Sequence, residues 1–379
     1  MKAVILYPYP AESDGLSIQG DMLYRGLLEQ GHDVLPCNRE GSTQKEFYFK
    51  NLKPDVAIGI GYWANAPHLI QHPLKFGVTP VPWFNADGWI ANYHKDIENL
   101  PLVFTTSDWV KETYKRDGVD VKNFVPLHIG IDTGLFKPLP KDDKIKGIRE
   151  MLGIKDELMI LTAGGDVTSK GAQEMFRALA KVNEKFKNWK YICKSWPSDN
   201  ASEWHMEEDK IIKELGIQDK VIFIDDVFSN DFMPYVLNAC DIYAAPSRLE
   251  GFGMIQVEAM SCGKPVISIN AMGPKETIVH GKTGFLANVA DKVILNQEWV
   301  YPWMGFSEEK ILKFDEPKVF AYRANIDELA EYTLKLLTDA ELRNKMGEEA
   351  RKHAVANFDY WVVSKKAADI IIEKFGLRE

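Results

Sequence analysis

The stretch at residues 246–258 reads PSRLEGFGMIQVE, and its glycines separate two different patterns. The apolar run that leads into it is typical of a strand, and the residues after Gly253 have helical character up to Gly263. A glycine-rich turn between a strand and a helix N-terminus exposes unpaired N–H groups and the positive end of the helix dipole, so this segment predicts an anion-binding site. Glu250 lies in the turn, and Glu258 lies about 7 Å further along the helix axis, given about 1.5 Å of rise per residue. The two carboxylates can therefore hold different parts of one ligand.

Short apolar runs alternate with helical stretches on both sides of a polar, proline-containing segment at residues 136–156. The candidate strands are residues 3–7, 33–37, 56–62, 80–84, 102–107 and 124–130, then 158–165, 190–196, 221–227, 242–247, 265–270 and 283–287. This alternation predicts an α/β protein with parallel sheets and right-handed crossovers. We expect two doubly wound domains, residues 1–145 and 146–359, that face each other across a cleft with ligands at the carboxyl ends of the strands.

Length and composition agree with two domains. The 379 residues are 45% hydrophobic, which is enough for two cores, and the net charge of −9 argues against nucleic acid as the main partner. No window reaches 18 uninterrupted apolar residues, and the first strand lacks the features of a signal peptide, so we expect a cytoplasmic protein without a transmembrane helix. The cysteines are widely spaced and form no C-x-x-C, which predicts reduced, buried thiols and no metal site: Cys37, Cys193, Cys240 and Cys262.

The quoted stretch and the residues after it resemble the E-x7-E signature of retaining glycosyltransferases of family 4, which have the GT-B fold and include relatives of glycogen, sucrose and trehalose synthases. The matching positions are Pro246, Ser247, Glu250, Phe252, Gly253, Glu258, Ala259, Gly263, Pro265, Val266, Gly273, Glu276 and residues 280–287. The resemblance is strong over residues 158–287 and looser before residue 108. It implies two Rossmann-like domains, the first on the acceptor side and the second binding a nucleotide sugar.

The resemblance also implies a role for each matching residue of the second domain. Glu258 would bind the ribose hydroxyls, and Lys170 with the helix that begins near Met254 would hold the diphosphate. The transferred sugar would be positioned by Glu250, Phe252 and Gly253. The backbone of Val227 would meet the nucleobase. In the first domain, Gly15 would bring its backbone against the donor phosphate or the acceptor sugar, although an ordinary turn glycine fits the same pattern.

The chain departs from the family pattern at two candidate binding positions. Family members carry an arginine where this chain has Gly165, so we expect another cation to help Lys170 with the diphosphate, and the candidates are Lys194 and Arg248. Family members also carry a histidine after the fourth strand, which is absent here. Asp87 lies in that neighbourhood and fits two roles equally well, a hydrogen-bond acceptor for sugar hydroxyls or an ordinary turn residue.

The third departure is an insertion at about residues 288–323, which is rich in aromatic side chains. It fits a sugar-stacking lid, an oligomer contact or packing on the flank of its own domain, and we favour a contribution to the acceptor side or the cleft edge. After the insertion, residues 360–379 match the closing helix that crosses back to the N-terminal domain in this fold.

The function implied by the resemblance is retaining, metal-independent transfer of a hexose. The donor would be a UDP-, GDP- or ADP-hexose, the acceptor a hydroxyl group of a sugar or small polyol, and no cofactor would be required. The sequence is also compatible with two alternatives: a nucleotide-sugar epimerase of the same fold, and a catalytically idle protein that binds sugar nucleotides. The second alternative is motivated by the missing arginine and histidine.

Overall fold

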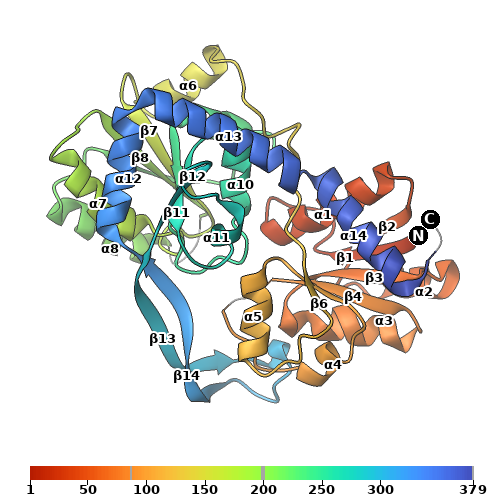
Figure 1. The fold of residues 1–379 in the computed structure, drawn as a ribbon. Helices are drawn as coiled ribbons and strands as arrows, with labels where there is room; N and C mark the ends of the chain where they lie inside the picture. The colour runs from red at the N-terminus through yellow and green to blue at the C-terminus, as the bar shows by residue number, and fades with distance from the viewer. Residues whose placement is uncertain (86–87, 198–200, 378–379) are drawn as a thin grey trace. The chain divides into compact units, whose positions relative to one another are not determined.

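The structure is a computed structural model that describes residues 1–85, 88–197 and 201–377. The chain forms two compact units: unit 1 contains Met1–Asp132, Ile294–Phe320 and Asn357–Glu379, and unit 2 contains Thr133–Val293 and Ala321–Ala356. Each unit is built around one parallel six-stranded sheet with helices between its strands (Figure 1). The expected fold class, α/β with two doubly wound Rossmann-like sheets, is therefore confirmed.

The sheet of unit 1 has the strand order β2-β1-β3-β4-β5-β6. Its strands are β1 (Lys2–Tyr7), β2 (Asp33–Asn38), β3 (Val56–Gly61), β4 (Thr79–Phe84), β5 (Val103–Thr105) and β6 (Phe124–Pro126). Its helices are α1 (Gly15–Glu29), α2 (Thr43–Leu52), α3 (His72–Lys75), α4 (His94–Glu98), α5 (Asp108–Arg116) and α14 (Tyr360–Phe375), with helical turns η1 (Trp63–Asn65) and η2 (Pro67–Gln71). The strand order reverses between β1 and β3, which makes their carboxyl ends a switch point of the kind that binds ligands.

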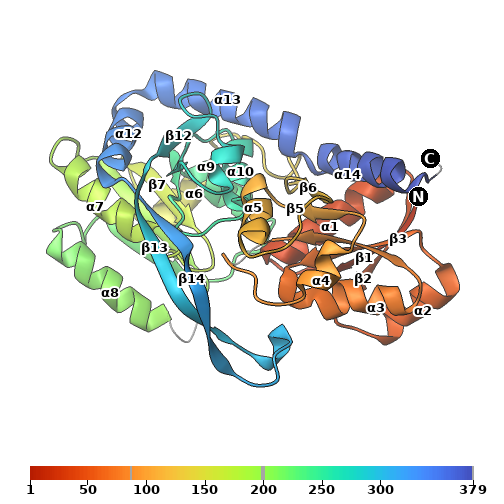
Figure 2. The same ribbon diagram turned by 60° about the horizontal axis from the view of Figure 1, so that its bottom comes forward.

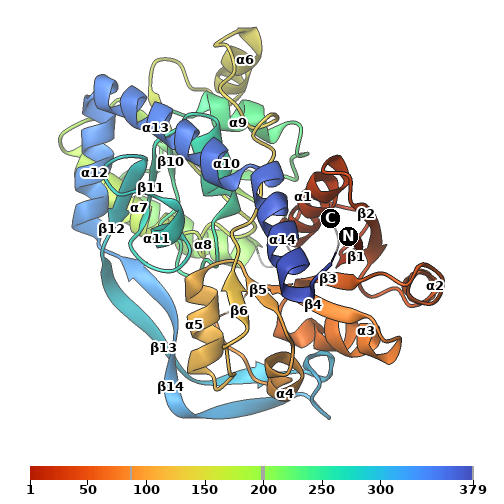
Figure 3. The ribbon, with the colours of Figure 1, turned by 45° about the vertical axis from the view of Figure 1, so that its right-hand side comes forward.

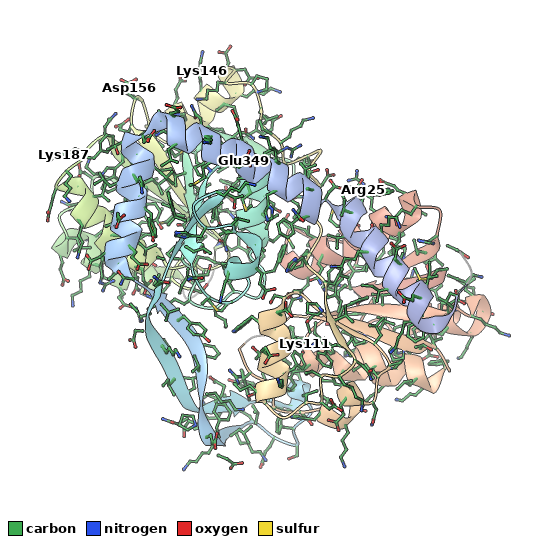
Figure 4. The ribbon with its side chains drawn as sticks, in the orientation of Figure 1. Arg25, Lys111, Lys146, Asp156, Lys187 and Glu349 are labelled. Atoms are coloured by element: carbon green, nitrogen blue, oxygen red, sulfur yellow. The ribbon has the colours of Figure 1, made fainter. Side chains whose placement is uncertain are left out.

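The first strand and helix of unit 1 are fixed by close packing. The Asp14 side chain accepts hydrogen bonds from the backbone of the first turn of α1 and so caps the helix. Gly20 lies against the ring of Tyr7, because a Cβ atom at position 20 would stand 2.3 Å from Tyr7 Cγ. Helix α14 packs on α1, and the Arg25 guanidinium, labelled in Figure 4, lies 4.4 Å from the centre of the Tyr360 ring.

The sheet of unit 2 has the strand order β12-β11-β10-β7-β8-β9. Its strands are β7 (Leu158–Ala163), β8 (Trp189–Ser195), β9 (Val221–Asp225), β10 (Ile242–Ala244), β11 (Val266–Ile269) and β12 (Gly284–Ala287). Its helices are α6 (Asp143–Met151), α7 (Ala172–Asn183), α8 (Ala201–Glu214), α9 (Met233–Ala239), α10 (Met254–Ser261), α11 (Pro274–Thr277), α12 (Ile326–Thr338) and most of α13 (Ala340–Phe358). Here the strand order reverses between β7 and β10, which makes their carboxyl ends the switch point of this sheet.

The stretch that we expected to link the two domains belongs instead with unit 2. Its carbonyl groups accept hydrogen bonds from unit 2 side chains, among them Phe136 O from Arg351 at 2.8 Å and Lys137 O from Asn238 at 3.0 Å. The Leu139 N–H donates to Asn238 Oδ1 at 2.9 Å. Because these contacts fix the backbone, the boundary between the compact units falls at Asp132 and not at residue 145.

The insertion forms a two-stranded ribbon, which we call the arm and define as residues 289–324. Its strands are β13 (Val289–Val300) and β14 (Lys310–Ala324), and the short helical turn η3 (Pro302–Met304) follows β13. Figure 2 shows the two strands running side by side. We expected the whole insertion to belong to the C-terminal domain, whereas Ile294–Phe320 groups with unit 1.

The arm groups with unit 1 because its apolar side chains complete the core of that unit. Val300 is fully buried in this core, and the other arm residues that pack against it are Met304, Phe306, Leu312, Phe314 and Phe320. The ring centres of Phe314 and Trp89 lie 5.5 Å apart. The Asn92 side-chain amide donates to the carbonyl oxygens of Met304 and Gly305, each at 3.2 Å. Figure 3 shows the end of the arm beside α4 and α5.

Candidate functional site

The candidate site lies at the switch point of unit 2, where β7 and β10 end. The loop after β7 carries Lys170, and the loop after β10 carries Glu250. The two loops are joined by a hydrogen bond from the Arg248 N–H to Ser169 O at 2.8 Å. Gly171 allows this close approach, since a Cβ atom there would stand 2.3 Å from the carbonyl oxygen of Pro246 and the residue has φ of +85°. The sequence thus brings both predicted residues to one edge of the sheet.

Lys170 and Glu250 form an ion pair at this edge. Lys170 Nζ lies 2.6 Å from Glu250 Oε2, with side-chain exposures of 24% and 16%. The other carboxylate oxygen, Oε1, accepts a hydrogen bond from the Gly253 N–H at 3.0 Å, at the start of α10. Glu250 therefore occupies both elements of the predicted anion site, the lysine and the N-terminus of the helix. An anionic ligand that binds there must compete with this carboxylate.

Glu258 is a buried carboxylate one turn further along α10. It is 4% exposed, and burial raises its pKa to about 8. Among the described residues, no side chain or backbone group donates a hydrogen bond to it. A buried polar group without a partner is uncommon in folded proteins, because burial removes its hydrogen bonds to water. Glu258 is thus available to accept hydrogen bonds from a ligand.

Gln256 is a second unpartnered polar side chain in the same helix, and the sequence analysis did not single it out. Both polar atoms of its amide are buried without a hydrogen-bond partner among the described residues. The amide lies beside Gly253, because a Cβ atom at position 253 would stand 2.5 Å from Gln256 Nε2. The available signal was a polar residue inside the apolar run MIQVEAM, only two positions before Glu258.

Arg248 does not present a free charge to the site. Its guanidinium donates to both carboxylate oxygens of Glu174, which is 3% exposed, at 3.0–3.2 Å, and to Gln173 Oε1 at 2.9 Å. Its carbonyl oxygen accepts from the Tyr322 N–H at 2.8 Å, which ties the base of the arm to the loop that carries Glu250. Arg323 also pairs with Glu174, at 2.9 Å. Arg248 thus contacts α7 through its side chain and the base of the arm through its carbonyl oxygen.

The other predicted site residues differ in their surroundings. Phe252 is buried beside the ion pair, and Met254 is the first residue of α10. Val227 follows β9 and is 58% exposed. Gly15 begins α1 in unit 1, where a Cβ atom would meet nothing within 4 Å, so packing does not require a glycine there. Asp87 lies outside the described residues, and its role stays a prediction, as do the roles of the others.

The loop after β4 in unit 1 is held by a buried carboxylate. Asp117 has a fully buried side chain and lies 2.6 Å from Lys318 Nζ of the arm and 2.8 Å from Arg116 Nε. Its second oxygen accepts from the Ile90 N–H at 2.7 Å. Burial alone would raise the pKa of Asp117, but the hydrogen bonds from Arg116, Lys318 and Ile90 lower it below the ordinary value. The arm, α5 and the loop after β4 thus meet at one ionised group.

Comparison with known proteins finds a family model that matches a large part of unit 2. Residues 144–295 match the family model of the glycosyl transferases group 1. This range contains every strand of the unit 2 sheet, together with Lys170, Glu250 and Glu258. The match supports the resemblance of this part of the chain to glycosyltransferases, which was inferred from the sequence.

Curated relatives match over a longer part of the chain. The D-inositol 3-phosphate glycosyltransferase of Stackebrandtia nassauensis is 28% identical over 268 residues, which cover 62% of this chain and 59% of the relative. The putative glycosyltransferase YtcC of Bacillus subtilis is 22% identical over 277 residues, which cover 71% of this chain and 60% of the relative. The chain therefore matches about three fifths of the length of these two relatives.

Solved structures show the same fold over nearly the whole chain. The sucrose-phosphate synthase of Thermosynechococcus elongatus has a TM-score of 0.73 with 16% identity, and the match covers 100% of both chains. Anabaena HepE, solved in complex with UDP-glucose, has a TM-score of 0.70 with 18% identity over 98% of this chain and 100% of that chain. At such identities the similarity shows the fold alone, which is GT-B.

No helix among the described residues has both the length and the hydropathy that crossing a bilayer requires.

Proposed function

We propose that the chain is a glycosyltransferase that moves a hexose from a nucleoside diphosphate sugar to a hydroxyl group of an acceptor. The observation that carries the proposal is the site at the switch point of unit 2. It combines a lysine, a helix N-terminus and a buried carboxylate without a hydrogen-bond partner among the described residues. A nucleoside diphosphate sugar offers the matching groups, namely a diphosphate and the hydroxyls of a ribose and a sugar. The match of this unit to the glycosyl transferases group 1 supports the same function.

Each residue of the site has a role in the proposed reaction. Lys170 and the N–H groups at the start of α10 bind the diphosphate and stabilise the negative charge that develops as it leaves. Glu250 releases Lys170 when the diphosphate enters, and it then accepts hydrogen bonds from hydroxyls of the transferred sugar. Glu258 accepts hydrogen bonds from the ribose.

The proposed stereochemical outcome is retention, and it rests on the resemblance to family 4. The departing phosphate oxygen would take the proton of the acceptor hydroxyl on the same face of the sugar. No acid and base pair of the glycosidase kind is then required. UDP-, GDP- and ADP-hexoses are the candidate donors, and a sugar or small polyol is the candidate acceptor.

We expect transfer without a divalent metal, because Lys170 and the α10 N-terminus supply the positive charge and the sequence contains no Asp-x-Asp. The measurement is release of nucleoside diphosphate from each candidate donor in excess chelator, with and without sugar and polyol acceptors. Release that depends on an acceptor and persists in chelator supports the proposal. Loss of activity in chelator that magnesium or manganese restores would refute metal independence.

The same assay separates the alternative functions. Conversion of the donor without an acceptor would indicate an epimerase, and binding of the donor without turnover would indicate a catalytically idle protein.

Substituting Glu258 tests the ribose role. Glu258→Ala should weaken binding of the nucleoside diphosphate by about 1–3 kcal/mol, the scale for leaving a hydrogen-bonded partner unmatched in a buried site. Calorimetric titration measures the change, and Glu348→Ala on α13 removes a carboxylate elsewhere in unit 2 as the control. Unchanged affinity in a folded Glu258→Ala variant would exclude the ribose role.

A further inference from the structure

Lys194 is a buried cation at the carboxyl edge of the unit 2 sheet. It is the next-to-last residue of β8 and is 4% exposed. With the described residues its ammonium makes no hydrogen bond and no ion pair, and it lies 5.2 Å from the centre of the Phe228 ring. Burial lowers the pKa of Lys194, and the Asp226 carboxylate acts in the opposite direction. Burial of this side chain removes much of the water around its ammonium without supplying a hydrogen-bond acceptor, which is unfavourable unless a ligand supplies one.

Lys194 is connected to the candidate site through Gly164, the residue that follows β7. The Gly164 N–H donates to Lys194 O at 3.1 Å. The stem of Lys170 passes over the same glycine, because a Cβ atom at position 164 would stand 2.7 Å from Lys170 Cγ. The two lysines therefore flank one glycine at the end of β7, at the switch point of the sheet.

The other two cations considered for this edge already have carboxylate partners. Lys170 pairs with Glu250, and Arg248 pairs with the buried Glu174. A nucleoside diphosphate carries more negative charge than one lysine and one helix terminus can offset. Of these three cations, only Lys194 lacks a carboxylate within ion-pair distance among the described residues.

We propose that Lys194 is the second cation of this site and contacts the phosphate groups of the bound nucleoside diphosphate. The assignment rests on the proposed function and names a further residue for it. The Phe228 ring holds the ammonium in place while the site is empty, because the face of an aromatic ring attracts a cation. Phosphate oxygens then supply the hydrogen-bond acceptors that the ligand-free site lacks.

The test is calorimetric titration of Lys194→Met and Lys194→Arg with UDP, GDP and ADP and with the corresponding nucleosides. Lys194→Met should weaken binding of the nucleoside diphosphate about 10- to 100-fold, the scale for a hydrogen bond to a charged group, and leave binding of the nucleoside unchanged. Lys194→Arg should keep part of the affinity. The melting temperature of ligand-free Lys194→Met should stay level or rise, since a buried charge is removed. Lys187→Met, at an exposed position before β8 labelled in Figure 4, is the control.

The possible outcomes separate this proposal from the function on which it rests. If wild-type protein binds a nucleoside diphosphate and Lys194→Met binds it equally well, the role of Lys194 is overturned and the proposed function stands. Equal losses for nucleoside and nucleoside diphosphate would also overturn the phosphate role. If Lys194→Met and a second uncharged variant, Lys194→Gln, both melt at clearly lower temperature, Lys194 stabilises the ligand-free fold and the proposed phosphate role is overturned. If the wild type binds none of the three nucleotides, the proposed function itself fails.

Discussion

Lys170→Ala should lower kcat/KM for sugar transfer about 100- to 1000-fold, the scale for removing one group that stabilises charge in a transition state. Lys170 Nζ lies at the switch point of unit 2, where it pairs with Glu250 at 2.6 Å. Because the leaving group gains negative charge as the glycosidic bond breaks, the substitution should lower kcat as well as raise KM. Steady-state rates with the active donor measure both terms.

The control for Lys170→Ala is Lys181→Ala, which removes a lysine from an exposed position on α7. It should leave both kinetic constants near the wild-type values. Lys170→Arg retains the positive charge and should keep more activity than the alanine variant. A Lys170→Ala variant with wild-type kcat/KM would show that this lysine takes no part in the reaction.

Asp117→Ala should lower the free energy of unfolding by about 3–5 kcal/mol, the scale for removing one partner of a buried ion pair. The Asp117 side chain is fully buried, whereas its partners Lys318 and Arg116 are 21% and 32% exposed. Its removal leaves these cations unpaired and frees the Ile90 N–H, so the arm loses an anchor on unit 1. Denaturant unfolding followed by circular dichroism measures the change. Asp120→Ala removes a half-exposed carboxylate three residues away and should change stability by less than about 1 kcal/mol.

The ion pair at Asp117 also predicts a pH dependence. Its pKa is lowered in the folded protein, so the unfolded chain binds a proton at a higher pH than the folded chain does. The stabilisation is therefore present above the unfolded pKa of about 3.9 and is lost as the pH falls through the folded pKa. The stability difference between wild type and Asp117→Asn should shrink on acidification from pH 6 to pH 3. A difference that stays constant over this range would contradict the assignment.

The sequence predicted the part of the molecule that local patterns determine. Short apolar runs separated by helical stretches marked the twelve strands described in the two sheets, because a parallel strand that is covered on both faces is apolar throughout. The turn before α10 was predicted from Gly253, which has φ of +94°. Lys170 and Glu250 were predicted for one site and lie 2.6 Å apart. These positions follow from the order of strands in a doubly wound sheet.

The parts that the sequence did not predict depend on pairing between distant segments. Arg248 was a candidate phosphate ligand, but its partner Glu174 lies in α7 and no local pattern connects the two residues. The arm carries Leu312 and Phe314 two positions apart, which is a strand pattern, yet the pattern does not say which unit they pack against. The contact of Phe314 with Trp89 arises only in the folded chain.

Nucleotide binding by unit 2 is tested most directly by calorimetric titration of the wild-type protein and of Glu250→Gln with UDP, GDP and ADP. We expect at least one of these nucleotides to bind the wild type. Glu250→Gln should bind the same nucleotide at least as tightly, because the carboxylate that occupies Lys170 and the start of α10 has lost its charge. Failure of all three nucleotides to bind the folded wild-type protein would contradict the proposal that unit 2 binds a nucleoside diphosphate sugar.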